Sequence, residues 1–175
     1  MKRNGSSGVA LVLAAVLLGS CGYHVSGKAD MMPKTLHTIA IPAWGNATVR
    51  YRLAERLPAA LTREFVNRTR YDVVADPNDA DAILTGSVVT FNAYPTIFDP
   101  VTGRAAAIQV LVILSVRLTE RATGKILYDR QNFEARQQYE IAVDPEAYFE
   151  ESGPAMERLS NEVARSVVSS VLEAF

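Results

Sequence analysis

An alternating stretch between residues 108 and 118 constrains the fold of this 175-residue chain more than any other feature. Successive side chains of a strand point to opposite faces, so residues at every second position share one face. One such set is entirely apolar and can face a core: Ile108, Val110, Val112, Leu114, Val116 and Leu118. The opposite set is polar at its ends but contains Leu111 and Ile113. We expect this strand to be central, because at a sheet edge it would invite aggregation.

The outward positions of Leu111 and Ile113 allow two interpretations. If the helices of the domain cover the other face, these two side chains lie on an open face and a partner covers them. Alternatively, they are exposed apolar residues among polar neighbours, which is common on protein surfaces. The sequence leaves both interpretations open.

Two other β-rich runs, residues 82–92 and 125–139, lie on either side of the central run, residues 107–120. Residues 121–124 join the last two runs and include a glycine, as short hairpin connections often do. The sequence therefore predicts a three-stranded antiparallel meander.

The segment 93–106, between the first two runs, is too long for a tight turn and is predicted to be a loop. It is unusually apolar, since it contains Tyr94, Ile97 and Phe98 beside prolines. At about 3.3 Å per residue the central strand is longer than most, so the hairpin can project beyond the helices. We expect this loop to make a buried contact with a partner; a loop packed on itself is the alternative.

Two helices are predicted from apolar residues that recur on one face. The first ends near Arg68 and has Leu53, Leu57, Leu61 and Phe65 at a spacing of four. Pro58 falls inside it and predicts a kink or a later start. The second begins at about Pro145, with Pro154 at a helix start, and has the stripe Met156, Leu159, Val163, Val167 and Val171.

A short strand at residues 38–41 precedes the first helix, and residues 71–74 form a short extended piece after it. The resulting order is β-α-β-β-β-α. It predicts an α+β two-layer sandwich, in which a mixed sheet of about four strands has both helices on one face.

The N-terminus resembles a bacterial lipoprotein signal. Lys2 and Arg3 precede ten apolar residues, Val9–Leu18, about half the length that a membrane-spanning helix needs. The junction Leu18-Gly19-Ser20-Cys21 matches a signal that is cut before a lipidated cysteine. We therefore expect a signal peptide at residues 1–20, a tether lipidated at Cys21 over residues 21–35, and a single domain at residues 36–175. Gly22, rather than aspartate, favours the outer membrane.

Composition excludes several classes of function. A net charge of −1 argues against a nucleic-acid binder, which needs a basic stripe. One cysteine and two histidines cannot build a Cys/His zinc site. The chain has no recognisable catalytic or phosphate-binding motif, so we expect no catalytic residues, no cofactor and no metal. An unfamiliar hydrolase is the remaining enzymatic alternative.

The segment Cys21-Gly22-Tyr23-His24-Val25 resembles the start of the LptE family of lipopolysaccharide-assembly lipoproteins, where Cys-Gly-aromatic-x-aliphatic is usual. The resemblance continues through Pro33, the strand at 38–41, the first helix and Ala80-Asp81-Ala82-Ile83-Leu84. The meander and the closing helix follow in the same order, so it covers nearly all of the mature chain.

This resemblance implies a lipid-anchored protein of the outer membrane of a Gram-negative-type bacterium. In that family the lipoprotein sits largely inside the lumen of the outer-membrane barrel LptD, assists its assembly and helps to deliver lipopolysaccharide to the cell surface. The competing hypothesis is an envelope scaffold that binds a periplasmic protein or the cell wall and has no barrel partner.

The resemblance also suggests which residues make contacts. Arginine suits lipopolysaccharide phosphates, and Arg104 is the first candidate, ahead of Arg117, Arg130 and Arg136. Each of these is equally compatible with an ordinary solvated arginine. The candidate contacts to the barrel are the apolar residues already singled out: Tyr94, Ile97, Phe98, Leu111 and Ile113.

Overall fold

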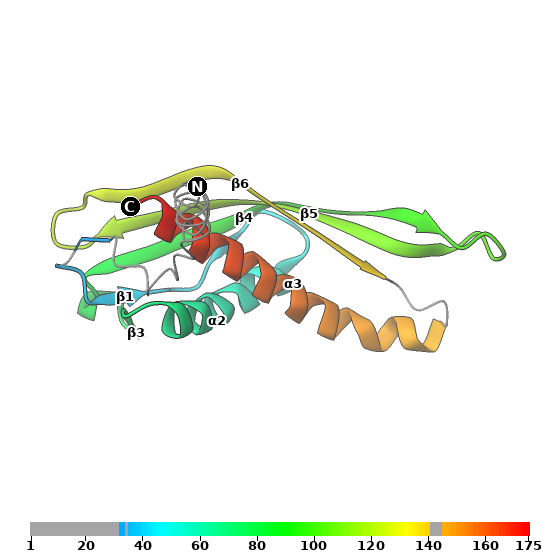
Figure 1. The fold of residues 1–175 in the computed structure, drawn as a ribbon, viewed down its shortest axis with the longest axis horizontal. Helices are drawn as coiled ribbons and strands as arrows, with labels where there is room; N and C mark the ends of the chain where they lie inside the picture. Colours follow the sequence, from blue (N-terminus) through cyan, green and yellow to red (C-terminus); the bar gives the residue numbers. More distant parts are fainter. Residues whose placement is uncertain (1–31, 34, 141–144) are drawn as a thin grey trace, which may run out of the picture.

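The computed structural model describes residues 32–33, 35–140 and 145–175. They form a sheet that two helices cover on one face (Figure 1). The elements are β1 (Thr38–Ala40), β2 (Gly45–Asn46), α2 (Tyr51–Arg68), β3 (Asp72–Val74), a 3-10 turn η1 (Pro77–Asp79), β4 (Ala82–Phe98), β5 (Ala105–Glu120), β6 (Ile126–Glu140) and α3 (Pro145–Glu173). The predicted α+β architecture is confirmed, with more strands than the four expected.

The sheet has six strands in the order β3-β1-β4-β5-β6, and β2 pairs separately with β4. β1 is parallel to both β3 and β4, whereas β4, β5 and β6 form the antiparallel meander. α2 provides the crossover between β1 and β3, because parallel neighbours cannot be joined by a tight turn. β5 lies between β4 and β6, so the prediction that this strand is not at an edge is confirmed.

The β4–β5 hairpin differs from the sequence prediction. β4 runs to Phe98 and β5 begins at Ala105, so most of the expected loop 93–106 is strand and only residues 99–104 connect the two. The error came from reading Pro95 as a loop residue, although an edge strand tolerates proline. Figure 1 shows the distal ends of both strands projecting beyond β6 and α2.

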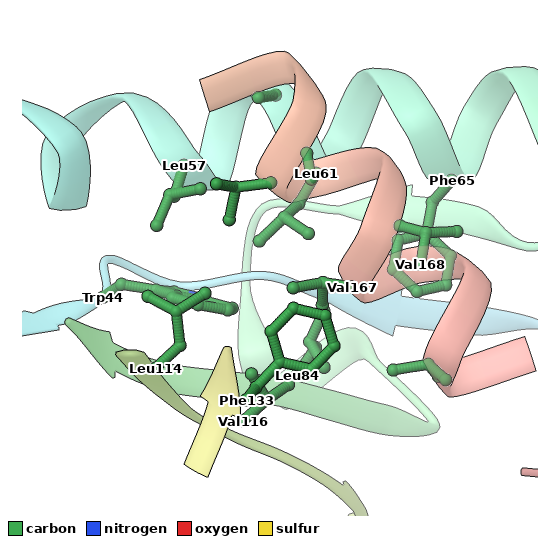
Figure 2. Close-up of a cluster of buried hydrophobic side chains, with 14 of the residues drawn as sticks. Trp44, Leu57, Leu61, Phe65, Leu84, Leu114, Val116, Phe133, Val167 and Val168 are labelled. Atoms are coloured by element: carbon green, nitrogen blue, oxygen red, sulfur yellow. The ribbon is translucent and has the colours of Figure 1, made fainter. Parts of the chain in front are cut away.

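The core lies between the sheet and the helices (Figure 2). The four apolar residues predicted for the first helix are all buried, as are Leu159, Val163, Val167 and Val171 of α3. The alternating set of β5 is buried from Val110 to Leu118, and Ile108 is partly buried against the same cluster. The apolar periodicity therefore identified the inward face of three elements.

Neither Pro58 nor Pro154 marks the start of a helix. α2 begins at Tyr51, ahead of its first leucine, and continues through Pro58. Pro154 lies inside α3, which begins at Pro145, so Pro154 does not mark a helix start. An internal proline costs roughly 3 kcal/mol or more, and the burial of each helix's apolar face offsets that cost.

The predicted signal peptide, Cys21 and most of the tether lie outside the described residues. Met32 and Leu36 are each only 2% exposed and belong to the core cluster. The packed part of the chain therefore begins within the segment 21–35 that the sequence assigned to the tether.

Asp81 joins the start of β1 to the start of β4. Its Oδ2 accepts hydrogen bonds from the backbone N–H groups of His37 and Thr38, at 2.8 and 3.0 Å. These two donors stabilise the charged carboxylate and so lower the pKa of Asp81 below its ordinary value.

We expect the substitution Asp81→Ala to lower the free energy of unfolding by about 1–2 kcal/mol, because two charge-assisted hydrogen bonds are lost. The folded pKa lies below the unfolded value of about 3.9, so this stabilisation is present above that pH and is lost as the pH falls through the folded pKa. Urea titrations at pH 7 and pH 3 measure both effects. The exposed Asp79 is the control; equal losses for Asp79→Ala and Asp81→Ala would contradict the assignment.

Candidate functional site

The tip of the projecting hairpin is a closed, hydrogen-bonded turn. The Asp99 Oδ1 accepts bonds from the N–H groups of Val101 and Thr102, at 2.9 and 2.6 Å, and from the Thr102 hydroxyl at 2.9 Å. Gly103 has a φ of 68° and donates its N–H to the Asp99 carbonyl, and the Asp99 N–H donates to the Arg104 carbonyl. The bonds from Thr102 and Val101 lower the pKa of Asp99. These bonds give the turn a defined backbone conformation.

The turn at the other end of β5 is built in the same way. Gly124 has a φ of 70° and donates its N–H to the Glu120 carbonyl, while the Glu120 N–H donates to the Lys125 carbonyl. Both turns follow one sequence pattern, an acidic residue, two variable residues, threonine, glycine and a basic residue. The two turns therefore share the same backbone hydrogen bonds and differ in their side chains, so substitutions in the second turn are matched controls for those in the first.

Large apolar side chains are exposed along the distal part of the hairpin. Tyr94, Ile97 and Phe98 are 43%, 51% and 57% exposed, so the candidate contact residues of this segment do not pack onto the core. Val101, at the tip, is 90% exposed and was not among the contact residues predicted from the sequence. Its position between Asp99 and Thr102 of the turn pattern was the signal that could have identified it. We call Tyr94, Ile97, Phe98 and Val101 the apolar tip.

Leu111 and Ile113 lie on the open face of the sheet and are half-buried. Their cross-strand partners on β4 are Asn92 and Thr90, and those on β6 are Arg136 and Glu134. The two apolar residues are thus surrounded by polar and charged ones. The open face is a mixed surface rather than an apolar patch.

The structure does not gather the four candidate arginines at one place. Arg104 lies in the turn at the tip, where no partner of its guanidinium is found among the described residues. Arg117 pairs with Asp129 at 2.9 Å and lowers the pKa of that carboxyl. Arg136 pairs with Glu134, and Arg130 lies 5.1 Å from the ring centroid of Phe133 and donates to Ser170 of α3. Only Arg104 therefore has an uncommitted charge next to the apolar tip.

None of the helices in the described ranges is long and apolar enough to span a membrane. Within the same ranges no three His, Cys, Asp or Glu side chains are grouped as metal ligands. The feature that stands out is the hairpin.

The chain matches the model of a known protein family. The model of the family described as LptE: Lipopolysaccharide-assembly matches residues 36–171, which span most of the chain and all of the elements from β1 to α3. The chain belongs to the LptE family. This membership confirms the resemblance drawn from the sequence, and it identifies an assembly lipoprotein of Gram-negative bacteria. The comparison with curated proteins gives no match to this LptE-family chain.

Solved structures share the fold at low sequence identity. A protein of Xanthomonas campestris is similar with a TM-score of 0.55 and 13% identity, over 83% of this chain and 89% of that one. A hypothetical protein of Chlamydia trachomatis gives 0.54 and 9%, over 78% and 96%. A putative lipoprotein of Caulobacter crescentus gives 0.50 and 17%, over 75% and 88%. These likenesses support the fold of this LptE-family member and extend no further.

Proposed function

We propose that this protein is an outer-membrane lipoprotein that plugs, and helps to assemble, a lipopolysaccharide-transport barrel of the LptD type, and thereby assists the insertion of lipopolysaccharide at the cell surface. Membership of the LptE family supports the assembly role. The observation that carries the proposal is the long hairpin, whose distal part projects beyond α2 and carries the exposed apolar tip. Exposed apolar groups on an extended strand are a liability in water, so they favour a function in which a partner covers them.

The open face of the sheet fits the interior of a barrel. The lumen-facing side of an outer-membrane barrel is polar. The open face carries the ion pairs Arg117–Asp129 and Arg136–Glu134 around Leu111 and Ile113. Such a mixed surface can meet a polar wall without burying unpaired charges.

The lipid anchor belongs to the same proposal. A lipid on Cys21 would hold the protein at the outer membrane, and two or more acyl chains make such an anchor stable. The role requires positioning and shape complementarity rather than bond chemistry, so it assigns no catalytic residue.

Site-specific crosslinking tests the barrel as partner. A photo-reactive amino acid at Phe98 should crosslink the lipoprotein to a large outer-membrane barrel in intact cells, because this residue is more than half exposed near the tip. The same probe at Ala122 occupies the matched turn at the other end of β5 and is the control. A lipoprotein that crosslinks to no barrel from Phe98 and is a monomer in mild detergent would contradict the proposal. Crosslinks from Phe98 to a soluble periplasmic protein or to the cell wall would favour the scaffold instead.

Charge reversal tests the lipopolysaccharide contact. We expect Arg104→Glu to weaken lipopolysaccharide binding roughly fivefold, because an exposed ion pair contributes up to about 1 kcal/mol. Lys125→Glu makes the same charge change in the matched turn and should leave binding unaltered. Titration of immobilised lipopolysaccharide with each purified variant measures the difference. Equal affinities of the two variants would remove Arg104 from the site.

A further inference from the structure

β4 has an open edge next to the apolar tip. β4 pairs with β5 along its whole length, but on its other side it pairs only with β1 at Ala82–Ile83 and with β2 at Ser87–Val88. From Thr90 to Phe98 the described residues provide no strand on that side. At about 3.3 Å per residue this edge is roughly 25–30 Å long.

The direction of the backbone groups along this edge follows from one hydrogen bond. The Val88 carbonyl accepts the Ala47 N–H, so the backbone N–H and carbonyl of Val88 point away from β5. A bulge at Val89 shifts the register by one residue, and backbone groups then alternate. The backbone groups of Phe91, Ala93 and Pro95 therefore point toward the open edge, and their side chains do not. Pro95 has no N–H to lose, which explains why a proline is tolerated there.

The other long edge of the sheet carries charged residues, whereas this one does not. β6 contains Asp129, Arg130, Glu134 and Arg136 and has a bulge between Arg130 and Phe133, and both features discourage further strand pairing. Residues 90–98 of β4 contain no charged residue, and the edge is interrupted by Pro95 and by register shifts between Pro95 and Phe98. An uncharged, exposed edge of this length favours pairing with an added strand.

A hollow of about 530 Å³ lies along the edge and is lined by Val49, Arg50, Phe91, Asn92, Ala93 and Tyr94. Phe91 and Ala93 belong to one face of the sheet and Asn92 and Tyr94 to the other, so the hollow flanks the strand itself. It continues the line of β2, which leaves β4 after Val88. An extended segment can occupy this space as the next strand.

The end of the hollow next to α2 is positive. Arg50 is exposed, and no ion pair of its guanidinium is found in the described part of the chain. Arg50 is also the N-cap of α2, which has no side-chain cap and no acidic residue in its first turn. The guanidinium and the free amides of the helix start both favour a carboxylate at this end.

We propose that the open edge of β4 from Thr90 to Ile97 is a strand-pairing site, at which an extended segment of the barrel partner adds to the sheet with an acidic side chain next to Arg50. The inference rests on the proposed function, because it takes the barrel as the occupant. A second copy of the chain fits less well. The β4 edge of a second copy, residues 90–98, carries no acidic side chain for Arg50. Asp99, which follows it, already accepts hydrogen bonds from Val101 and Thr102.

Amide hydrogen exchange, read residue by residue, tests the pairing on the full lipoprotein, alone and in the complex purified with its barrel. The amides of Asn92 and Tyr94 face β5 and should be protected in both states. The amides of Phe91 and Ala93 should exchange at least about tenfold more slowly in the complex, because only there do they gain an acceptor.

A proline scan of the two edges provides the second measurement. Ala93→Pro removes an outward amide of β4, and Gln138→Pro removes an outward amide of the β6 edge as the matched control. We expect Ala93→Pro, but not Gln138→Pro, to shorten the lifetime of the complex about tenfold. Arg50→Glu should weaken the complex roughly fivefold relative to Lys125→Glu.

The outcomes separate this inference from the proposed function. A complex that forms while Phe91 and Ala93 still exchange fast, and that is equally stable with either proline, overturns the pairing and leaves the barrel partner in place. Absence of any bound barrel overturns both. Protection of these amides in a dimer of the isolated lipoprotein identifies a second copy as the occupant and overturns the assignment to the barrel.

Discussion

The substitution Gly86→Val is expected to lower the free energy of unfolding by about 3 kcal/mol or more. A Cβ atom at Gly86 would lie 2.7 Å from two ring carbons of Trp44 and 2.8 Å from the carbonyl oxygen of Ser115. The carbonyl belongs to β5 and the ring is enclosed in the core, so neither can move away freely (Figure 2). Overpacking of this kind costs typically 1–3 kcal/mol and occasionally more, and valine adds two methyl groups beyond the Cβ.

Urea unfolding of the mature protein measures the effect, and Gly153→Val is the control. A Cβ at Gly153 meets nothing within 4 Å, so its replacement should change stability by less than about 1 kcal/mol. In a Trp44→Ala background the penalty of Gly86→Val should fall, because the ring contacts disappear while the Ser115 contact remains. A Gly86→Val variant as stable as the parent would show that Trp44 does not pack against β4 as described.

Two acidic substitutions at the apolar tip are expected to reduce capture of the barrel more than tenfold. The pair Ile97→Asp and Phe98→Asp places negative charges where the proposed contact is apolar, and leaving such charges unpaired in an interface costs several kcal/mol. Both side chains are more than half exposed in the isolated chain, so folding should be unaffected. Quantitative co-purification of the barrel from detergent-solubilised membranes measures the loss.

The control for the tip is Ile126→Asp. Ile126 is 50% exposed, close to the 51% of Ile97, and it lies near the opposite end of β5. This variant should capture the barrel as well as the parent does. If the tip variant and the Ile126 variant capture equal amounts, the tip is not the contact and the function proposed for it is wrong.

The layers of the fold were predictable because burial leaves a periodic trace in the sequence. The period of two from Val110 to Leu118 identified the inward face of the central strand, and the spacing of four from Leu53 to Phe65 identified that of α2. β2 and β3 were not predicted as members of the sheet. They are only two and three residues long, and pairing with distant strands, rather than local preference, determines such short segments.

The length of the β4–β5 hairpin was not predicted from the sequence. The turn pattern of Glu120–Lys125 occurs again at Asp99–Arg104, so the tight connection was present in the sequence. The sequence prediction instead took Pro95 and Pro100 as signs of a long loop. Pro95 is accommodated because its nitrogen faces an open edge, a property of the assembled sheet that no short stretch of sequence displays.

The candidate site was predictable to a similar degree. Tyr94, Ile97 and Phe98 could be selected as apolar residues in an unusual place, and the structure leaves them exposed. The partners of Arg117, Arg130 and Arg136 could not be foreseen, because each lies on another strand or helix or depends on the strand geometry. The contact of Trp44 with Gly86 likewise joins two elements and becomes visible only in three dimensions.

The burial of Met32 has a consequence for how the protein stands on the membrane. With Cys21 lipidated as proposed, only Gly22 to Met31 separate the acyl chains from the first core residue. About ten residues span at most about 35 Å, so the core cannot lie further than that from the lipidated cysteine. The chain enters the core at the end of the molecule that holds β1, remote from the hairpin tip (Figure 1). With this anchor the bilayer would hold one end of an elongated body close, and the hairpin tip would lie far from the point of attachment.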